Sequence, residues 1–388
     1  MPAEWEPHEA TWIGWPCNRD DWPGKISPIP WVYGEIVRKI APGEVVRIIA
    51  NERTERQARR LLARIGVDLA RVEFFLFPFD RGWMRDAGPI FVRRDAPPRE
   101  VAIARFRFNG WAKYRDWKRD ARIPLLASRK LGLRLLPARI GERDFVLEGG
   151  SVEVNGRGTL LTTEECLLDP KVQVRNPGLG RKEIEEALAA NLGVKHVLWL
   201  GKGIVGDDTH GHIDDVCRFV NRRTVVLCQE NDPRDPNYVP LQENRERLQG
   251  MKLEDGSRPE VVSLPMPAPL FLDRQRLPAS YANFYIANTA VLVPTFNDPQ
   301  DRVALSVLAE LFADRFVVGI HAVDLVWGLG TIHCLTQQQP SVRSQKMEPV
   351  PGCRLVRRNG LTSLAVQRTN ISHTGGCEAD VRRSTGDK

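Results

Sequence analysis

Long apolar runs, a secretory signal and paired cysteines are all missing from this 388-residue chain. No stretch approaches the ~20 consecutive apolar residues that a membrane-spanning helix requires, so we expect no membrane partner. The N-terminus is acidic and broken by proline instead of basic and then apolar, so we expect no signal peptide. The seven cysteines are scattered without metal-site spacing, which is typical of reduced thiols in the cytoplasm. These absences favour a cytoplasmic globular protein.

An evenly basic composition is also missing, although the net charge is +7. Nine basic and four acidic residues lie within 341–388, so this segment carries a charge of +5 and the rest of the chain about +2. Because a nearly balanced body is unlike a nucleic-acid-binding protein, we expect no nucleic acid partner. We predict one folded domain over residues 1–340 and a basic tail over residues 341–388 that is disordered or loosely packed.

A recurring order of elements is present. A polar cluster precedes a short strand pair, and helices and further strands separate one cluster from the next. The predicted strands are 45–50, 72–77, 90–92, 101–108, 151–154, 159–162, 196–200, 216–220, 224–228, 290–293 and 316–320, and the predicted helices are 54–65, 182–192 and 299–313. The clusters centre on Asp86, Glu148, His212, Asn283 and Cys334, roughly 50 to 70 residues apart.

Repeats of this kind predict an α/β fold of five pseudo-symmetric blades around one axis, a five-bladed propeller. The polar clusters would then meet at the centre. We expect residues 10–15 to close the last blade beside the strand that follows Cys334.

The acidic stretch at 207–215 has an alternating pattern. Asp208, His210, His212 and Asp214 are two residues apart, so their side chains share one face if the stretch is extended. One interpretation is a zinc or iron site built on the His-x-His pair. Another is a metal-free site in which His212 moves protons while carboxylates hold a cation. A third is an exposed polar loop.

Cys334 is the candidate nucleophile. Gly328 and Gly330 give the backbone freedom just before it, and the β-branched and apolar residues around it predict that it begins a strand. A single cysteine is more often a buried packing residue, so the case for a catalytic Cys334 depends on the residues around it. Thiolates attack electron-poor carbon at neutral pH when a partner lowers their proton affinity.

A thiol among carboxylates suits a guanidine. Four acids, Asp86, Glu148, Asp208 and Asp214, would raise the pKa of the thiol above its usual ~8.5. A planar guanidinium forms bidentate hydrogen bonds with carboxylates, and its positive charge stabilises a neighbouring thiolate. It also presents an electron-poor carbon to the sulfur. We therefore expect a small cationic guanidine as the partner.

Several separate motifs resemble one family. They are WMRDAGP at 83–89, LEGGS at 147–151, GHID at 211–214 and IHCLTQQ at 332–338, together with the opening MPAEWEPHEAT at 1–11. In this order they resemble the agmatine deiminase and bacterial-type peptidyl-arginine deiminase family, within the guanidine-modifying pentein superfamily. The resemblance covers residues 1–340 and implies a catalytic five-bladed α/β propeller without metal or other cofactor.

The resemblance also implies roles for matched residues. Cys334 would attack the guanidine carbon and form a covalent thiouronium with loss of ammonia, and water would then release a ureido product. Asp86 and Asp214 would clamp the guanidinium, His212 would act as acid and then base, and Glu148 would hold the cation or orient His212. The remaining expected substrate-binding residues are Asp208, Trp83, Trp111 and Asn283.

The expected reaction is the conversion of agmatine to N-carbamoylputrescine and ammonia, in polyamine synthesis or agmatine use, by a homodimer on family analogy. There are three alternatives. One is deimination of peptidyl- or free arginine, another is a metal-dependent hydrolase that uses His210, His212 and Asp214, and the third is a noncatalytic binder of guanidines or polyamines. The chain departs from the family pattern at four positions. Leu329 stands where glycine is common, Thr331 and Asp215 stand where asparagine is common, and His210 stands where asparagine or aspartate is common.

Overall fold

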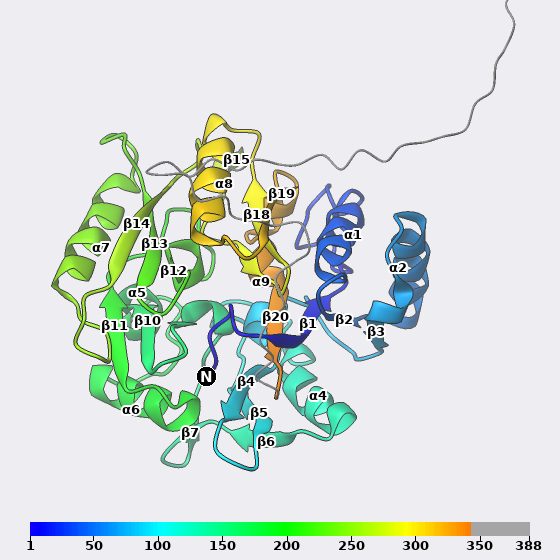
Figure 1. The fold of residues 1–388 in the computed structure, drawn as a ribbon, viewed down its shortest axis with the longest axis horizontal. Helices are drawn as coiled ribbons and strands as arrows, with labels where there is room; N and C mark the ends of the chain where they lie inside the picture. The colour runs from blue at the N-terminus through cyan, green and yellow to red at the C-terminus, as the bar shows by residue number, and fades with distance from the viewer. Residues whose placement is uncertain (343–388) are drawn as a thin grey trace, which may run out of the picture. The chain divides into compact units, whose positions relative to one another are not determined.

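Residues 1–342, the part of the chain that this computed structural model describes, contain five sheets of three or four strands, two two-stranded sheets (β7–β8 and β15–β16) and the helices between them (Figure 1). The strands are β1 (His8–Gly14), β2 (Val45–Ile49), β3 (Val72–Phe75), β4 (Ile90–Arg94), β5 (Glu100–Arg105), β6 (Arg134–Pro137), β7 (Arg139–Ile140), β8 (Arg143–Asp144), β9 (Glu153–Val154), β10 (Thr159–Thr163), β11 (His196–Leu200), β12 (Cys217–Phe219), β13 (Thr224–Gln229), β14 (Glu260–Pro265), β15 (Phe271–Leu272), β16 (Gln275–Arg276), β17 (Tyr285–Ile286), β18 (Ala290–Thr295), β19 (Phe316–His321) and β20 (Thr336–Pro340). The helices are α1 (Ile29–Ile40), α2 (Glu52–Arg64), α3 (Met84–Ala87), α4 (Ile123–Leu131), α5 (Glu164–Leu168), α6 (Arg181–Leu192), α7 (Tyr238–Gly250), α8 (Pro299–Leu311) and α9 (Ile332–Leu335).

The sheets repeat one order of elements, which confirms the predicted recurring unit. In β4–β5–β6, the first two strands are antiparallel and the third is parallel to the second. The same order holds in β9–β10–β11, β12–β13–β14 and β17–β18–β19. Because a parallel strand needs a long crossover, one or more helices precede each third strand: α4, α5 with α6, α7 and α8 respectively. Figure 1 shows helices α2, α4, α6 and α7 toward the outside of the strands.

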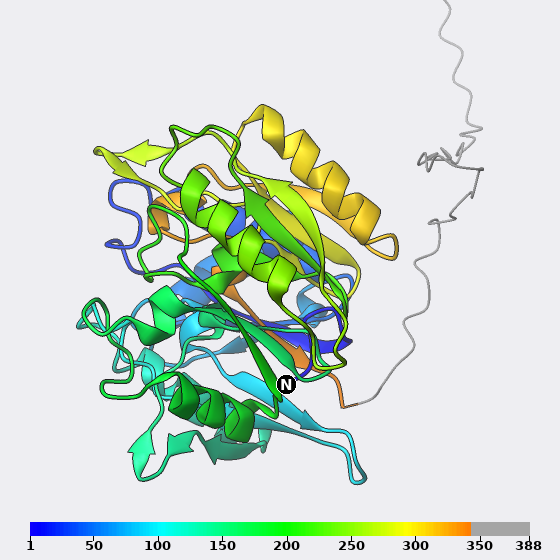
Figure 2. The same cartoon turned by 90° about the vertical axis from the view of Figure 1, so that its left-hand side faces the viewer.

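The four-stranded sheet joins the two ends of the described chain. Its order is β20–β1–β2–β3, and β20 runs antiparallel to β1 with Thr11 opposite Gln338 and Trp12 opposite Gln337. Figures 1 and 2 both show β20, in orange, beside the blue N-terminal segment. The prediction that residues 10–15 pair with the strand after Cys334 is confirmed.

Helix ends follow local capping chemistry. The Asn51 side chain accepts a hydrogen bond from the Thr54 backbone N–H, so α2 begins earlier than the predicted residue 54. Asp298 caps α8 and Pro299 occupies its first turn, as predicted, although the helix ends at Leu311 instead of residue 313. Gly193, with φ of 69°, ends α6 where the sequence predicted a stop.

The central strands are buried on both faces. On β1, Trp12 packs against Phe75 in one apolar cluster while Ile13 belongs to the largest cluster. β20 is buried although it is rich in glutamine, and two of its glutamines have polar partners: Gln339 accepts from Trp12 Nε1 at 3.0 Å and Gln338 accepts from Arg85 at 2.7 Å. This pairing fixes the segment that follows Cys334.

A polar residue precedes the first strand of each sheet. Asp86 lies in α3 before β4, Glu148 precedes β9, His212 precedes β12, and Asn283 precedes β17. Cys334 lies in α9 before β20; the prediction that it begins a strand is therefore wrong by one helical turn. Within residues 1–342, no helix is long and apolar enough to cross a membrane. The predicted tail lies, from residue 343 onward, outside the described residues.

Candidate active site

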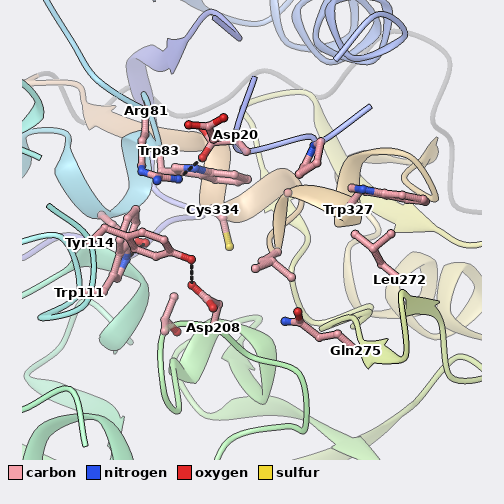
Figure 3. A pocket seen from close by; sticks show the side chains of 16 residues that line it. Asp20, Arg81, Trp83, Trp111, Tyr114, Asp208, Leu272, Gln275, Trp327 and Cys334 are labelled. Atoms are coloured by element: carbon pink, nitrogen blue, oxygen red, sulfur yellow. Dashed lines mark hydrogen bonds and ion pairs between the residues drawn. The ribbon is translucent and has the colours of Figure 1, made fainter. Parts of the chain in front are cut away.

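The Cys334 sulfur points into a cavity of about 280 Å³ (Figure 3). Of the nine residues expected at the site, five line this cavity. The other four are buried next to it: His212 contacts Asp86, Asp214 and Asn283 contact Cys334, and Glu148 contacts His212. The cavity is lined by Asp20, Asp21, Pro23, Arg81, Trp83, Asp86, Trp111, Tyr114, Asp208, Thr209, Leu272, Gln275, Trp327, Gly328, Leu329 and Cys334. The sequence-predicted residues therefore gather at one place in the fold.

Cys334 is held by close backbone packing and by Asn283. A side chain at Gly330 would lie 3.0 Å from the Cys334 Cβ and 2.9 Å from the Trp83 ring, so only glycine fits there. The Asn283 amide Nδ2 donates to the Cys334 Sγ at 3.1 Å, which places Asn283 beneath the thiol instead of on the cavity wall. Burial raises the pKa of the Cys334 thiol well above its usual value, and the Asp214, Asp215 and Asp86 carboxyls raise it further.

Asp86 is oriented by two donors. The Gly150 N–H donates to its Oδ1 at 3.0 Å and the Trp111 Nε1–H donates to its Oδ2 at 2.9 Å. A side chain at Gly150 would lie 2.8 Å from that oxygen, so glycine is needed for the approach. Burial raises the pKa of Asp86 to about 6. The charges of Asp214 and Glu148 also raise it, whereas the nearby His212 lowers it. Asp86 is thus ready to pair with a cation.

His212 lies between three carboxylates without a hydrogen bond to any of them. Its Nδ1 is 3.8 Å from Asp86 Oδ1 and 4.0 Å from Asp214 Oδ1, and its Nε2 is 3.6 Å from Glu148 Oε2. Among residues 1–342, both ring nitrogens and Asp214 Oδ1 are buried without a hydrogen-bond partner. Burial alone would lower the pKa of His212, but the negative charge of Asp86 and the closeness of Glu148 and Cys166 raise it well above its usual value.

Glu148 has a partner that the sequence did not indicate. Arg175 Nε lies 3.3 Å from both Glu148 oxygens, and both side chains are fully buried. Arg175 is itself held by the Gln173 and Thr209 carbonyls. Burial would raise the pKa of Glu148, but the Arg175 charge outweighs this and lowers it. Of the two roles expected for Glu148, the geometry favours orienting His212, since Arg175 already neutralises the carboxylate.

The segment 207–212 is not extended, so the condition under which its alternating side chains would share one face is not met. His210 and Gly211 have φ of 66° and 94°, which turn the chain and separate the two histidines. Asp207 Oδ2 accepts from the Gly211 and His212 N–H groups and so stabilises the turn. Asp208 still reaches the cavity, where it accepts from the Tyr114 hydroxyl at 2.7 Å (Figure 3).

The His210–His212–Asp214 metal set is not assembled. His210 Nε2 lies 2.9 Å from Asp169 Oδ2, and its side chain is partly exposed. Within the described part of the chain, the groups whose ligand atoms lie within 4.8 Å of one another are Glu148 with Cys166 and His212, and Asp214 with Asp215 and Cys334. In the first of these groups, the Glu148 carboxylate is already paired with the Arg175 guanidinium.

The other departures from the family pattern have local explanations. Thr331 Oγ1 donates to Asn283 Oδ1 at 2.7 Å, and Asn283 Nδ2 donates to Asp215 Oδ1 at 2.9 Å. Burial raises the pKa of Asp215 well above its usual value, and the Asp214 and Asp207 charges raise it further. Leu329 adopts φ of 67° and lines the cavity, where it narrows the space beside Cys334.

These features define a guanidine-modifying α/β enzyme of the pentein type. Residues 1–340 match the family described as Porphyromonas-type peptidyl-arginine deiminase, and the chain belongs to that family, as predicted. An agmatine deiminase of Pseudomonas aeruginosa (strain LESB58) is 36% identical, over 88% of this chain and 96% of that protein. One of Medicago truncatula is also 36% identical, over 88% and 96% respectively. The solved agmatine deiminase of Enterococcus faecalis superposes with a TM-score of 0.80, at 31% identity, and covers 88% and 96%.

The site predicts charge-selective labelling of Cys334. A haloacetamidine should alkylate this thiol faster than the matching haloacetamide, because the acidic cavity concentrates a cation beside sulfur. The ratio of the two rates should grow as pH rises through about 6, since Asp86 then loses its proton and gains its charge. Rates followed by mass spectrometry, with Asp86→Asn as the comparison, test this. Equal rates for both reagents at all pH values would contradict it.

Proposed function

We propose that this chain is an agmatine deiminase that hydrolyses agmatine to N-carbamoylputrescine and ammonia. The observation that carries the proposal is a group of three buried atoms that have no hydrogen-bond partner within residues 1–342: His212 Nδ1, His212 Nε2 and Asp214 Oδ1. The other oxygen of Asp214 lies 3.8 Å from the Cys334 Sγ. A guanidinium offers N–H donors to carboxylate oxygens and an electrophilic carbon to sulfur. The agmatine deiminases similar to this chain support the same substrate class.

Substrate binding activates the thiol in this mechanism. The guanidinium pairs with Asp86 and with the free Oδ1 of Asp214, and its positive charge offsets the carboxylates that hold the pKa of Cys334 high. Cys334 then loses its proton to solvent and its sulfur forms a bond to the guanidine carbon. The positive charge of the bound guanidinium therefore lowers the pKa of the Cys334 thiol relative to its value in the free enzyme.

His212 transfers protons in both halves of the reaction. As the imidazolium, it donates a proton to the departing nitrogen; the C–N bond breaks, ammonia leaves and a thiouronium remains on Cys334. The neutral imidazole next takes a proton from water, whose oxygen bonds to the same carbon. The C–S bond breaks, the proton of the new hydroxyl group passes to the departing sulfur, and the Cys334 thiol and the neutral ureido product are formed. The sum is one guanidine and one water giving one urea and one ammonia.

The repeated sheets support a five-bladed propeller over the catalytic domain of residues 1–340. Each blade would be one sheet, and the residue that precedes its first strand would face the centre: Asp86, Glu148, His212, Asn283 and Cys334. The contacts between these residues support this arrangement. A homodimer and a cytoplasmic location stay predictions.

The outer part of the cavity favours agmatine over arginine. Four of its lining residues are acids, Asp20, Asp21, Asp86 and Asp208, and the basic one is Arg81. Arg81 is already paired with Asp21 and with Asp116, the latter at 3.0 Å. Asp208 is likewise paired with Lys113, so Asp20 is the acid of the lining that is left to interact with the far end of a ligand. Its negative charge would repel an α-carboxylate and attract the ammonium end of agmatine.

A substrate panel tests the proposal. Ammonia release should be at least roughly 100-fold more efficient from agmatine than from free arginine, because a buried uncompensated carboxylate costs several kcal/mol. Peptidyl-arginine and methylated guanidines complete the panel, and kcat/KM for each is measured by coupled ammonia assay. If kcat/KM is higher for arginine or peptidyl-arginine, that compound replaces agmatine as the proposed substrate. If no guanidine releases ammonia, the proposed deiminase function is wrong.

A further inference from the structure

Glu4, in the segment before β1, lies buried at the meeting point of several strands. Only 3% of it is exposed. Its Oε1 accepts from Arg218 Nη2 at 2.9 Å and from the Ile286 N–H at 2.8 Å. Its Oε2 accepts from Arg85 Nη2 at 2.9 Å and lies 2.8 Å from His333 Nε2. The N-terminal segment thus places a carboxylate against the residue that directly precedes Cys334.

His333 connects this carboxylate to the guanidinium clamp. Its Nδ1 lies 2.7 Å from Asp214 Oδ2, while its Nε2 faces Glu4, and the ring is 1% exposed. Carboxylates only accept, so both contacts are hydrogen bonds when each ring nitrogen carries a hydrogen. The result is a continuous line of Glu4, His333 and Asp214 that joins three segments far apart in sequence.

This line decides which oxygen of Asp214 is available. His333 occupies Oδ2, and Oδ1 is the oxygen without a partner among residues 1–342. Asp214 Oδ1 lies 4.0 Å from His212 Nδ1, and Oδ2 lies 3.8 Å from the Cys334 Sγ. If the ring of His333 were free to rotate, the carboxylate could rotate as well and lose its orientation.

We propose that Glu4 is a positioning residue for guanidine deimination, acting through His333 to hold Asp214 with Oδ1 toward the substrate. The inference rests on the proposed function. It assigns the opening segment of the chain a part in the site, although Glu4 touches neither substrate nor thiol.

A structural role alone would have a different signature. Glu4 also neutralises Arg85 and Arg218, and Arg218 is further paired with Glu153 at 2.8 Å. Loss of those contacts would lower the thermal midpoint without changing kcat/KM below the unfolding transition. Positioning of Asp214 predicts a change in kinetics that depends on His333.

The first variant pair is Glu4→Gln and Glu6→Gln. Glutamine keeps the size of Glu4 but removes its charge, and we expect kcat/KM for agmatine to fall roughly 10- to 100-fold, with KM raised and kcat lowered. Glu6 lies in the same segment, where it pairs with Arg93 at 2.7 Å, and its replacement should leave kinetics unchanged. Circular dichroism and thermal midpoints confirm that each variant is assayed folded.

A double-mutant cycle with His333→Asn decides the route. Asparagine can donate to Asp214 from the Nδ1 position but does not reach Glu4, so H333N severs the line. The double variant E4Q/H333N should then lose little more kcat/KM than either single variant. Additive losses, or an E4Q variant as active as the unmodified protein, would overturn the inference. If E4Q does not fold, H333N decides: a clear loss supports the line, and unchanged kcat/KM overturns it.

The control is the unmodified protein with agmatine. Without ammonia release there, the proposed function fails and the inference fails with it. With normal turnover there and unaffected variants, only the role of Glu4 is lost.

Discussion

Replacing Cys334 by serine should reduce ammonia release from agmatine by roughly 10⁴-fold or more, as removal of a catalytic nucleophile typically does. A hydroxyl is a far weaker nucleophile than a thiolate, and one bound cation offsets only part of that difference. Binding of agmatine should persist, because Asp86 and Asp214 provide the charge complement and neither is altered. Single-turnover ammonia release and isothermal titration calorimetry measure the two quantities on the same variant.

Cys17→Ser is the matched control. Cys17 is half-buried and does not line the cavity, so its replacement should leave turnover intact. Turnover that survives in Cys334→Ser would remove the covalent mechanism. Loss of binding along with turnover would indicate that the thiol supports the cavity wall instead of acting on the bound guanidine.

Local patterns were sufficient for most strands and several helix ends. Strand 196–200 was predicted with its observed bounds, and Gly193 and Pro299 marked helix termini because their backbone preferences act locally. Helix α1 was missed, although its buried residues Ile29, Tyr33, Ile36, Val37 and Ile40 have helical spacing. The proline at its start and the isolated glycine within it disguised that pattern.

The residues that meet at the site were predictable as a set, but their partners were not. Asp86, His212 and Cys334 each stand in a polar cluster before a strand, which is a signal visible along the chain. Arg175 and Glu4 lie in no such cluster, and Glu4 reaches a histidine 329 residues away. Charged residues usually lie at the surface, so only the fold reveals that these two are buried ion-pair partners.

The shared face considered for residues 207–214 is lost for a specific backbone reason. Period-two alternation indicates a shared face only if the chain is extended, and the left-handed conformations of His210 and Gly211 break that condition. A histidine at positive φ is uncommon, so nothing in its residue type announced the turn. Asp208 therefore lies in the cavity and His210 outside it, two residues apart.

Replacing His212 by glutamine should lower agmatine turnover by roughly 1,000-fold, within the range that a positioned acid–base group contributes. Glutamine can contact Asp86 and Glu148 but cannot transfer the proton that the leaving ammonia needs. Because the carboxylates hold the pKa of His212 well above its usual value, the imidazolium persists through neutral pH and is lost only as pH rises through that raised pKa. Turnover in the unmodified protein should fall along this alkaline limb.

The matched control for this prediction is His210→Gln, two residues away in the same loop. His210 pairs with Asp169 and does not line the cavity, so this variant should keep both its turnover and its alkaline limb. A metal site built on the two histidines would instead require equal losses in both variants. Pre-steady-state ammonia release against pH, measured for both, separates proton transfer from metal binding, and an alkaline limb that persists in His212→Gln would assign the proton to another group.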